Sequence, residues 1–119
     1  MGHLTTHVLD TATGQPACGM AWILYQIKPD HTKITSGETN REGRNDNPII
    51  EGIDFKIGIY ELIFMTGNYF RSMGVDLPEP PFLDEISLRF GIANPDEQYH
   101  VPLLISPMDT APTEAANSA

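Results

Sequence analysis

The chain has 119 residues, of which 40% are hydrophobic and 19% charged, and these values are ordinary for one globular domain with its own core. Its formal net charge of -9 and the scatter of its seven Lys and Arg residues argue against a nucleic-acid partner. A single cysteine excludes an intrachain disulfide framework. Because the sequence shows neither a signal peptide nor a membrane-spanning run of roughly 18 apolar residues, we expect a cytoplasmic protein without a membrane partner.

The pattern along the chain is mostly an alternation of apolar and polar residues, interrupted at short intervals by Gly, Pro, Asn and Asp. This pattern predicts seven short strands, at residues 3–10, 19–27, 33–39, 49–50, 55–65, 85–92 and 98–106. The strand at 19–27 is apolar on both faces, which suits a central place in a sheet or a subunit contact. Only residues 68–73 are typical of a helix, of one or two turns.

Short strands at regular spacing with one short helix predict an all-β fold, an antiparallel β-sandwich. Residues 40–48 form a charged loop between two of the strands. The sequence after Pro107 is rich in Ala, Pro, Thr and Glu and has no periodicity. We therefore predict a folded domain over residues 1–107 and a flexible tail over residues 108–119.

Two histidines stand in apolar, strand-like surroundings near opposite ends of the chain. His7 lies within residues 4–10, and His100 lies within residues 99–104 together with Pro102. Packing does not explain these residues, because an imidazole needs a hydrogen-bond partner and proline cannot donate to a sheet ladder. Either histidine alone is more simply explained by a neighbouring backbone partner. Together they predict one shared site, in which a pair of histidines divides the roles of general acid and base.

Arg44 is a candidate for binding a substrate at this site. It lies in the charged loop, and its planar guanidinium can anchor an anionic or carbonyl-rich molecule. A solvated loop charge is the more common explanation for a lone arginine. Arg41, three residues earlier in the same loop, is a weaker candidate for the same role.

Other common catalytic arrangements are absent from the sequence. His3 and His7 have the spacing of metal ligands on a helix, but on a strand they lie roughly 13 Å apart and cannot share an ion. Cys18 lies in a turn without a base that the sequence reveals, and there is no Gly-x-Ser-x-Gly nucleophile elbow. We therefore expect no metal, and any hydrolysis is expected to use activated water.

Three segments form a recognisable combination. They read Leu-Thr-Thr-His-Val-Leu-Asp-Thr with Gly-Gln-Pro-Ala at residues 4–17, Thr-Asn-Arg-Glu-Gly-Arg at 39–44, and Tyr-His-Val-Pro-Leu-Leu-Ile-Ser-Pro at 99–107. Together they resemble the 5-hydroxyisourate hydrolases, the transthyretin-related enzymes of urate breakdown. The Asn-Tyr-Phe at 68–70 resembles the short helix of the same family.

The resemblance implies a transthyretin-like antiparallel β-sandwich that assembles as a homotetramer, a dimer of dimers, with its sites at subunit interfaces. It implies that His7, Arg44 and His100 line the site. The histidines would activate water for attack on a ring amide carbon, and the arginine would bind carbonyl groups and stabilise negative charge. The substrate would be a small purine-derived molecule, and neither a metal nor a cofactor would be needed.

The C-terminal sequence departs from the family. Members typically carry a Tyr-Arg-Gly-Ser that completes the pocket, whereas Pro107 is followed here by Met-Asp-Thr-Ala-Pro-Thr. A pocket without that polar wall suits a bulkier substrate with fewer donors, so we predict an N-methylated substrate such as trimethyl-5-hydroxyisourate, from caffeine breakdown. The alternatives are an ordinary 5-hydroxyisourate hydrolase and a non-enzymatic binder of small ligands, as transthyretin is. Both histidines and Arg44 favour an enzyme.

Overall fold

The computed structural model describes residues 2–107, and the predicted tail at 108–119 lies outside this range. The strands are β1 (His3–Asp10), β2 (Gln15–Pro16), β3 (Ala21–Lys28), β4 (Thr32–Glu38), β5 (Ile50–Glu51), β6 (Gly58–Phe64), β7 (Ile86–Ile92) and β8 (Gln98–Ile105). A 3-10 turn, η1 (Gly52–Asp54), precedes β6, and the helix α1 (Thr66–Ser72) follows it.

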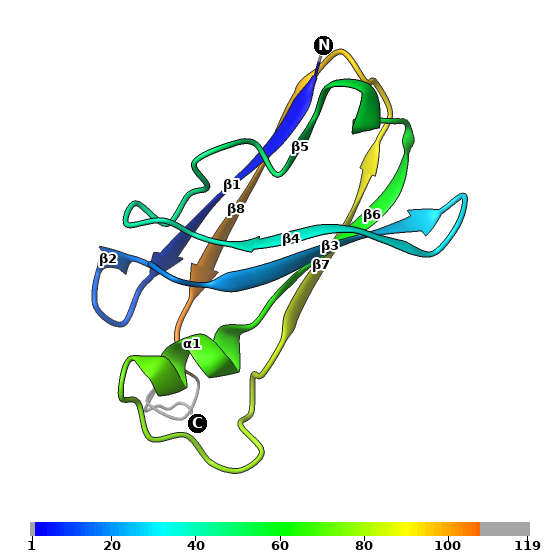
Figure 1. Cartoon of the computed structure of the whole chain (residues 1–119). Coiled ribbons are helices and arrows are strands. Elements are labelled where there is room, and N and C mark those ends of the chain that lie inside the picture. The colour runs from blue at the N-terminus through cyan, green and yellow to red at the C-terminus, as the bar shows by residue number, and fades with distance from the viewer. Residues whose placement is uncertain (1, 108–119) are drawn as a thin grey trace.

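The strands form a sandwich of two sheets, as predicted (Figure 1). One sheet contains β4, β3, β6 and β7 in that order, so the doubly apolar β3 occupies the predicted central position. In the other sheet β8 pairs with β1 along its whole length, while β2 and β5 pair with the two ends of β1. The helix lies at one end of the sandwich, at the bottom of Figure 1.

The pairing of β1 with β8 adds one parallel pair to the predicted antiparallel sandwich. These two strands are parallel, whereas the other pairs described within residues 2–107 are antiparallel. Alternation has the same period of two in both arrangements, so it does not reveal strand direction. The parallel register sets Thr5 opposite His100 and His7 opposite Pro102. Two histidines that are 93 positions apart in the chain thereby become diagonal neighbours.

The alternation decides which side chains of β1 face the core. Leu4, Thr6 and Val8 are buried between the sheets, while Thr5 and His7 are only partly buried on the outer face. The outer residues of β8 are its exposed ones, including His100. Both histidines therefore lie on the outer face of this sheet, where a ligand can reach them.

Several predicted boundaries move in the structure, among them the starts of one strand and of the helix. The strand expected from residue 55 begins at Gly58, because residues 52–54 form a 3-10 turn and buried Phe55 packs on Tyr99 with ring centroids 5.7 Å apart. The helix begins at Thr66 rather than at residue 68. Its buried Tyr69 donates a hydrogen bond to the buried Asp10 carboxylate at 3.1 Å, which joins α1 to the end of β1.

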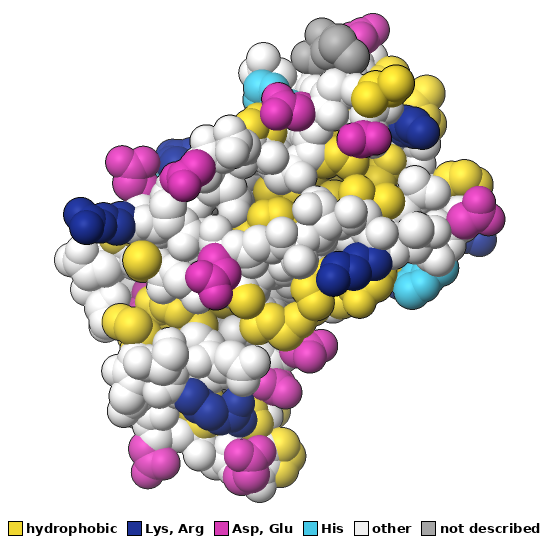
Figure 2. Space-filling view, viewed as in Figure 1, with side chains coloured by type: hydrophobic (Ala, Val, Ile, Leu, Met, Phe, Trp, Pro, Cys, Tyr) yellow, Lys and Arg dark blue, Asp and Glu magenta, His cyan; other side chains and the backbone are white. Residues whose placement is uncertain are grey.

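The surface agrees with the acidic composition. On the face shown in Figure 2, acidic side chains are spread widely and the basic side chains stand apart from one another. Such a face offers no continuous basic surface to a polyanion. The helix present within residues 2–107 is too short to cross a membrane.

Candidate active site

The loop between β4 and β5 is held against β1 by hydrogen bonds. The Asn40 side-chain oxygen accepts from the N–H groups of Glu42 and Arg44, at 2.9 and 3.1 Å. The Asn40 N–H donates in turn to the Arg44 carbonyl at 2.6 Å. The Gly43 carbonyl accepts from the Val8 N–H at 2.8 Å, which attaches the loop to β1. These hydrogen bonds fix the backbone of Arg44 and therefore the point from which its side chain extends.

Gly43 is required for this attachment for two reasons. Its φ of 74° lies in the left-handed region, which residues with a side chain adopt at a cost. A Cβ at this position would also lie far inside contact distance of the Val8 carbonyl oxygen. Only a glycine allows the loop to approach β1 this closely, so Gly43 determines the position of the neighbouring Arg44.

His100 is oriented by a residue of the adjacent strand. Its Nδ1 lies 2.8 Å from the Thr5 hydroxyl oxygen, and the two form a hydrogen bond across the β1–β8 pair. The hydroxyl donates to Nδ1 in one tautomer and accepts from Nδ1–H in the other. A fixed Nδ1 partner directs the opposite ring nitrogen, Nε2, toward other molecules.

The surroundings favour the neutral form of His100. Partial burial, then the positive charge of Arg44, then His7 lower the pKa of His100 below its ordinary value of 6.5. Both residues act electrostatically on this imidazole, and the β1–β8 register makes His7 a diagonal neighbour of His100. A histidine that is neutral at physiological pH can act as a general base.

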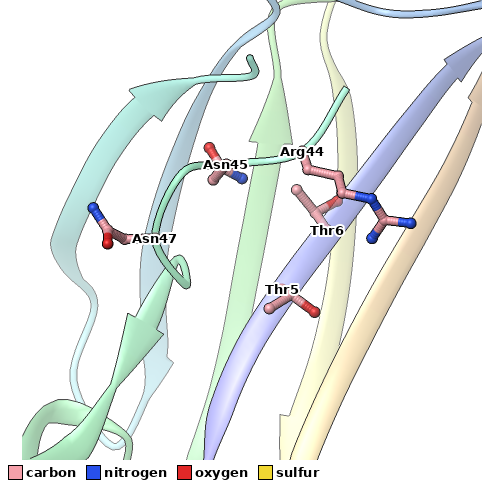
Figure 3. A pocket seen from close by; sticks show the side chains of 5 residues that line it. All are labelled: Thr5, Thr6, Arg44, Asn45 and Asn47. Atoms are coloured by element: carbon pink, nitrogen blue, oxygen red, sulfur yellow. The ribbon is translucent and has the colours of Figure 1, made fainter. Parts of the chain in front are cut away.

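A pocket of about 110 Å³, drawn in Figure 3, is lined by Thr5 and Arg44 among others, but by neither His7 nor His100. Its lining residues are Thr5, Thr6, Arg44, Asn45 and Asn47. The guanidinium of Arg44 extends from the loop across β1 toward β8 in this view. Both predicted arginines are exposed, and Arg44 lines this pocket whereas Arg41 does not.

Two residues of this region were not identified by sequence reasoning. Thr5 shares a strand face with His7, so its position was available from the alternation, but its partner depended on the β1–β8 register. Asn45 follows Arg44 in a loop without periodicity, and its bond to Trp22 depends on loop conformation. Within residues 2–107, no three His, Cys, Asp or Glu side chains are grouped as metal ligands would be.

We expect a titration of His100 to show its lowered pKa directly. Because the pKa in the folded state lies below the unfolded value, protonation opposes folding. The stabilising contribution of neutral His100 is therefore complete above about pH 6.5 and is lost as the pH falls through the lower, folded pKa. Replacing Arg44 by Gln should raise this pKa while leaving it below 6.5, since burial is the largest cause of the shift.

The measurement is an NMR titration of the His100 ring carbon signals. Arg41→Gln is the matched control, since it removes one positive charge from the same loop, and it should leave the titration of His100 unchanged. A wild-type pKa at or above 6.5, or equal values in wild type and Arg44→Gln, contradicts the prediction.

Comparison with known proteins defines the family. Residues 4–110 match the model of the HIUase/Transthyretin family. The chain belongs to this family. The match spans most of the chain and includes all three predicted site residues, and the predicted transthyretin-like fold is confirmed.

Several members of the HIUase/Transthyretin family are closely similar to this chain. A 5-hydroxyisourate hydrolase of Pseudomonas aeruginosa is 53% identical over 108 residues, which cover 90% of this chain and 86% of that protein. The 5-hydroxyisourate hydrolase 2 of Rhizobium meliloti is 55% identical over 107 residues, 89% of each chain. These relatives confirm the prediction of an enzyme of the hydrolase class.

A solved structure is also closely similar. The crystal structure of (S)-allantoin synthase has a TM-score of 0.85 and 46% sequence identity to this chain. The similarity covers 89% of this chain and 40% of that one. This chain therefore corresponds to less than half of the length of that protein.

Proposed function

We propose that this protein hydrolyses 5-hydroxyisourate by opening a ring amide with water activated by histidine. The observation that carries the proposal is the position of His100, which is hydrogen-bonded to Thr5 and has a lowered pKa through burial, Arg44 and His7. Relatives at 53% and 55% identity are named 5-hydroxyisourate hydrolases, which supports this substrate.

In the proposed reaction His100 is the general base. With Nδ1–H donating to the Thr5 hydroxyl, the unprotonated Nε2 accepts a proton from water as the water oxygen attacks the amide carbon. The attack gives a tetrahedral oxyanion. When the C–N bond breaks, the proton held by a histidine passes to the leaving nitrogen, so the ring opens to a carboxylic acid and an N–H group.

Arg44 and His7 complete the proposed site. The guanidinium of Arg44 binds carbonyl oxygens of the substrate and stabilises the negative charge that develops on the oxyanion. His7 lies on the strand next to His100, and in this proposal it exchanges the proton between water and the leaving nitrogen.

An N-methylated hydroxyisourate is the second candidate substrate. The residues after Pro107 contain no Tyr, Arg or Gly, so they do not supply the Tyr-Arg-Gly-Ser of the family. A site with fewer hydrogen-bonding groups accepts ring nitrogens that carry methyl groups in place of N–H donors. The relatives named above favour the unmethylated compound, which is why it is placed first.

One experiment ranks the three functions. Freshly generated 5-hydroxyisourate and its trimethyl analogue are followed by their ultraviolet absorbance, with and without the protein. Faster loss of the unmethylated compound supports the main proposal, and a clear preference for the trimethyl compound supports the second candidate. If the protein accelerates neither decay yet binds either compound, it is a binder and the proposed reaction is wrong.

We further propose that the site is completed by a second copy of the chain in a cytoplasmic homotetramer. Pro102 and Leu104 lie on the outer face of β8 beside the histidines, and Leu104 is 68% exposed. An apolar surface next to a polar site is typical of a subunit contact. Pro102 lies on β8, which has one unpaired edge among the described residues. Proline is tolerated on such a strand because it has no N–H to donate to a neighbouring strand.

Leu104→Glu tests this assembly. A charged side chain on the covered face is expected to convert the tetramer to smaller species, because burying an unpaired carboxylate is unfavourable. Light scattering after size-exclusion chromatography gives the mass. Phe82→Glu, at a 76% exposed position in the connector before β7, is the control and should retain the wild-type mass. An unchanged mass for Leu104→Glu contradicts the proposed contact.

A further inference from the structure

The side-chain amide of Asn45 has one bonded end and one end without a partner. Its oxygen accepts a hydrogen bond from the Trp22 indole N–H at 2.7 Å. Because the indole nitrogen only donates, this bond settles which end of the amide is the oxygen. The nitrogen, Nδ2, is buried and has no hydrogen-bond partner among residues 2–107. Among residues 2–107 it is the only buried side-chain donor or acceptor that lacks a hydrogen-bond partner.

An unpaired buried donor of this kind is unusual. Leaving a donor unsatisfied costs on the order of 1–3 kcal/mol, so native structures contain few of them. Asn45 lines the same pocket as Arg44 and Thr5. In Figure 3 its nitrogen end is turned toward the side on which Thr6 and Arg44 lie. Asn45 therefore contributes to the wall of this pocket, and its unpaired donor is turned to the side of Thr6 and Arg44.

The edge of β1 adds main-chain groups to this wall. The Leu4 carbonyl accepts from the Ile49 N–H, and the Val8 N–H donates to Gly43. Alternate residues of a strand direct their main-chain groups to the same edge, so the N–H and C=O of Thr6 also face the loop. Within residues 2–107 the loop makes main-chain bonds to residues 4 and 8 of this edge but not to residue 6.

We propose that Asn45 is a substrate-binding residue whose Nδ2 donates a hydrogen bond to a carbonyl oxygen of the heterocycle held by Arg44. The proposal rests on the proposed function for the class of ligand. The pocket then presents a donor from Asn45, charged donors from Arg44, and the main-chain donor and acceptor of Thr6. A cyclic amide or imide edge, with its alternating C=O and N–H groups, is complementary to this set.

The proposed role predicts the same effect for both candidate substrates. Methylation of ring nitrogens leaves the carbonyl oxygens in place, so a donor to a carbonyl does not distinguish the two compounds. Asn45→Asp keeps an oxygen for Trp22 and replaces the donor by a negatively charged acceptor. We expect kcat/KM to fall about ten- to hundredfold for whichever compound the wild type hydrolyses, mainly through a higher KM.

Asn47→Asp is the matched control. Asn47 lies on the same pocket and is exposed, so this substitution introduces the same charge and leaves the Asn45 donor unaltered. The proposal requires the loss in Asn45→Asp to exceed the loss in Asn47→Asp at least tenfold. Equal losses in the two variants overturn it, because charge alone then explains the effect.

A second measurement separates binding from folding and from the proposed function. Trp22 is the only tryptophan of the chain, so its single indole N–H signal reports the bond to Asn45, and its fluorescence reports a bound heterocycle. Urate is used as a stable, carbonyl-rich probe. We expect urate to change the fluorescence of the wild type at concentrations at least tenfold below those needed by Asn45→Asp, with the indole signal retained in both.

Each outcome of this measurement decides the proposal. Equal urate affinities with a retained indole signal overturn it. If the indole signal of Asn45→Asp is lost through misfolding, Asn45→Ser, which deletes the amide, is compared with the wild type under the same criterion. If the wild type hydrolyses neither compound, the proposed function fails, while the urate affinities still decide whether Asn45 binds a carbonyl heterocycle.

Discussion

His100→Asn is expected to lower kcat/KM for ring opening by about 10²–10⁴-fold while the fold stays intact. In the wild type the Thr5 hydroxyl oxygen lies 2.8 Å from His100 Nδ1. An asparagine at this position can hydrogen-bond to the same hydroxyl through its side-chain oxygen or nitrogen. It has no group that accepts a proton from water near neutral pH. The variant therefore removes the base and retains the contact between β1 and β8.

The control for this prediction is another histidine. His31 stacks on Tyr25 of the other sheet, with ring centroids 5.4 Å apart, and does not belong to the candidate site. His31→Asn should keep the wild-type kcat/KM. Initial rates on fresh substrate give the activities, and thermal unfolding shows whether each variant folds. If His100→Asn retains wild-type turnover, the assignment of His100 as the general base is wrong.

Gly43→Ala is expected to destabilise the protein by about 2–4 kcal/mol and to lower kcat/KM by at least tenfold. An alanine in the left-handed region costs about 1–2 kcal/mol. Its Cβ also forces the loop away from the Val8 carbonyl. This movement breaks the hydrogen bond from the Val8 N–H to the carbonyl of residue 43, and the Val8 N–H is left without that partner. Arg44 moves with the loop, away from His100.

Gly14→Ala isolates the conformational part of this effect. Gly14 has the same φ of 74°, but nothing lies within 4 Å of a Cβ built there. We expect Gly14→Ala to cost only about 1–2 kcal/mol and to retain the activity of the wild type. Chemical denaturation and initial rates measure both quantities. If the two alanine variants have the same stability and activity, the close approach of the loop to β1 does not position Arg44.

The tertiary structure also changes how the candidate residues are understood. The prediction that His7 and His100 share a site rested on their unusual surroundings, and the structure brings the two strands together in parallel register. It adds Thr5 as the partner that orients His100. It also adds Asn45, which no pattern in the sequence distinguished from the other polar residues of the loop.

The sequence by itself determined the class of fold, the residues that face the core and the candidates for chemistry. These properties are local, because alternation and turn residues act over a few positions. For this reason β1, β3 and β8 lie close to their predicted bounds. The family resemblance was determined in the same way, by three short segments, and the family match over residues 4–110 confirmed the family.

Only the tertiary structure decided which strands pair, in which direction and in which register. These relations join residues far apart in the chain, and a strand with a period of two satisfies many partners equally well. The parallel pairing of β1 with β8 sets Thr5 opposite His100, and the contact of Gly43 with Val8 brings Arg44 to the same edge. The candidate site therefore depends on long-range hydrogen bonds that no local pattern of residues encodes.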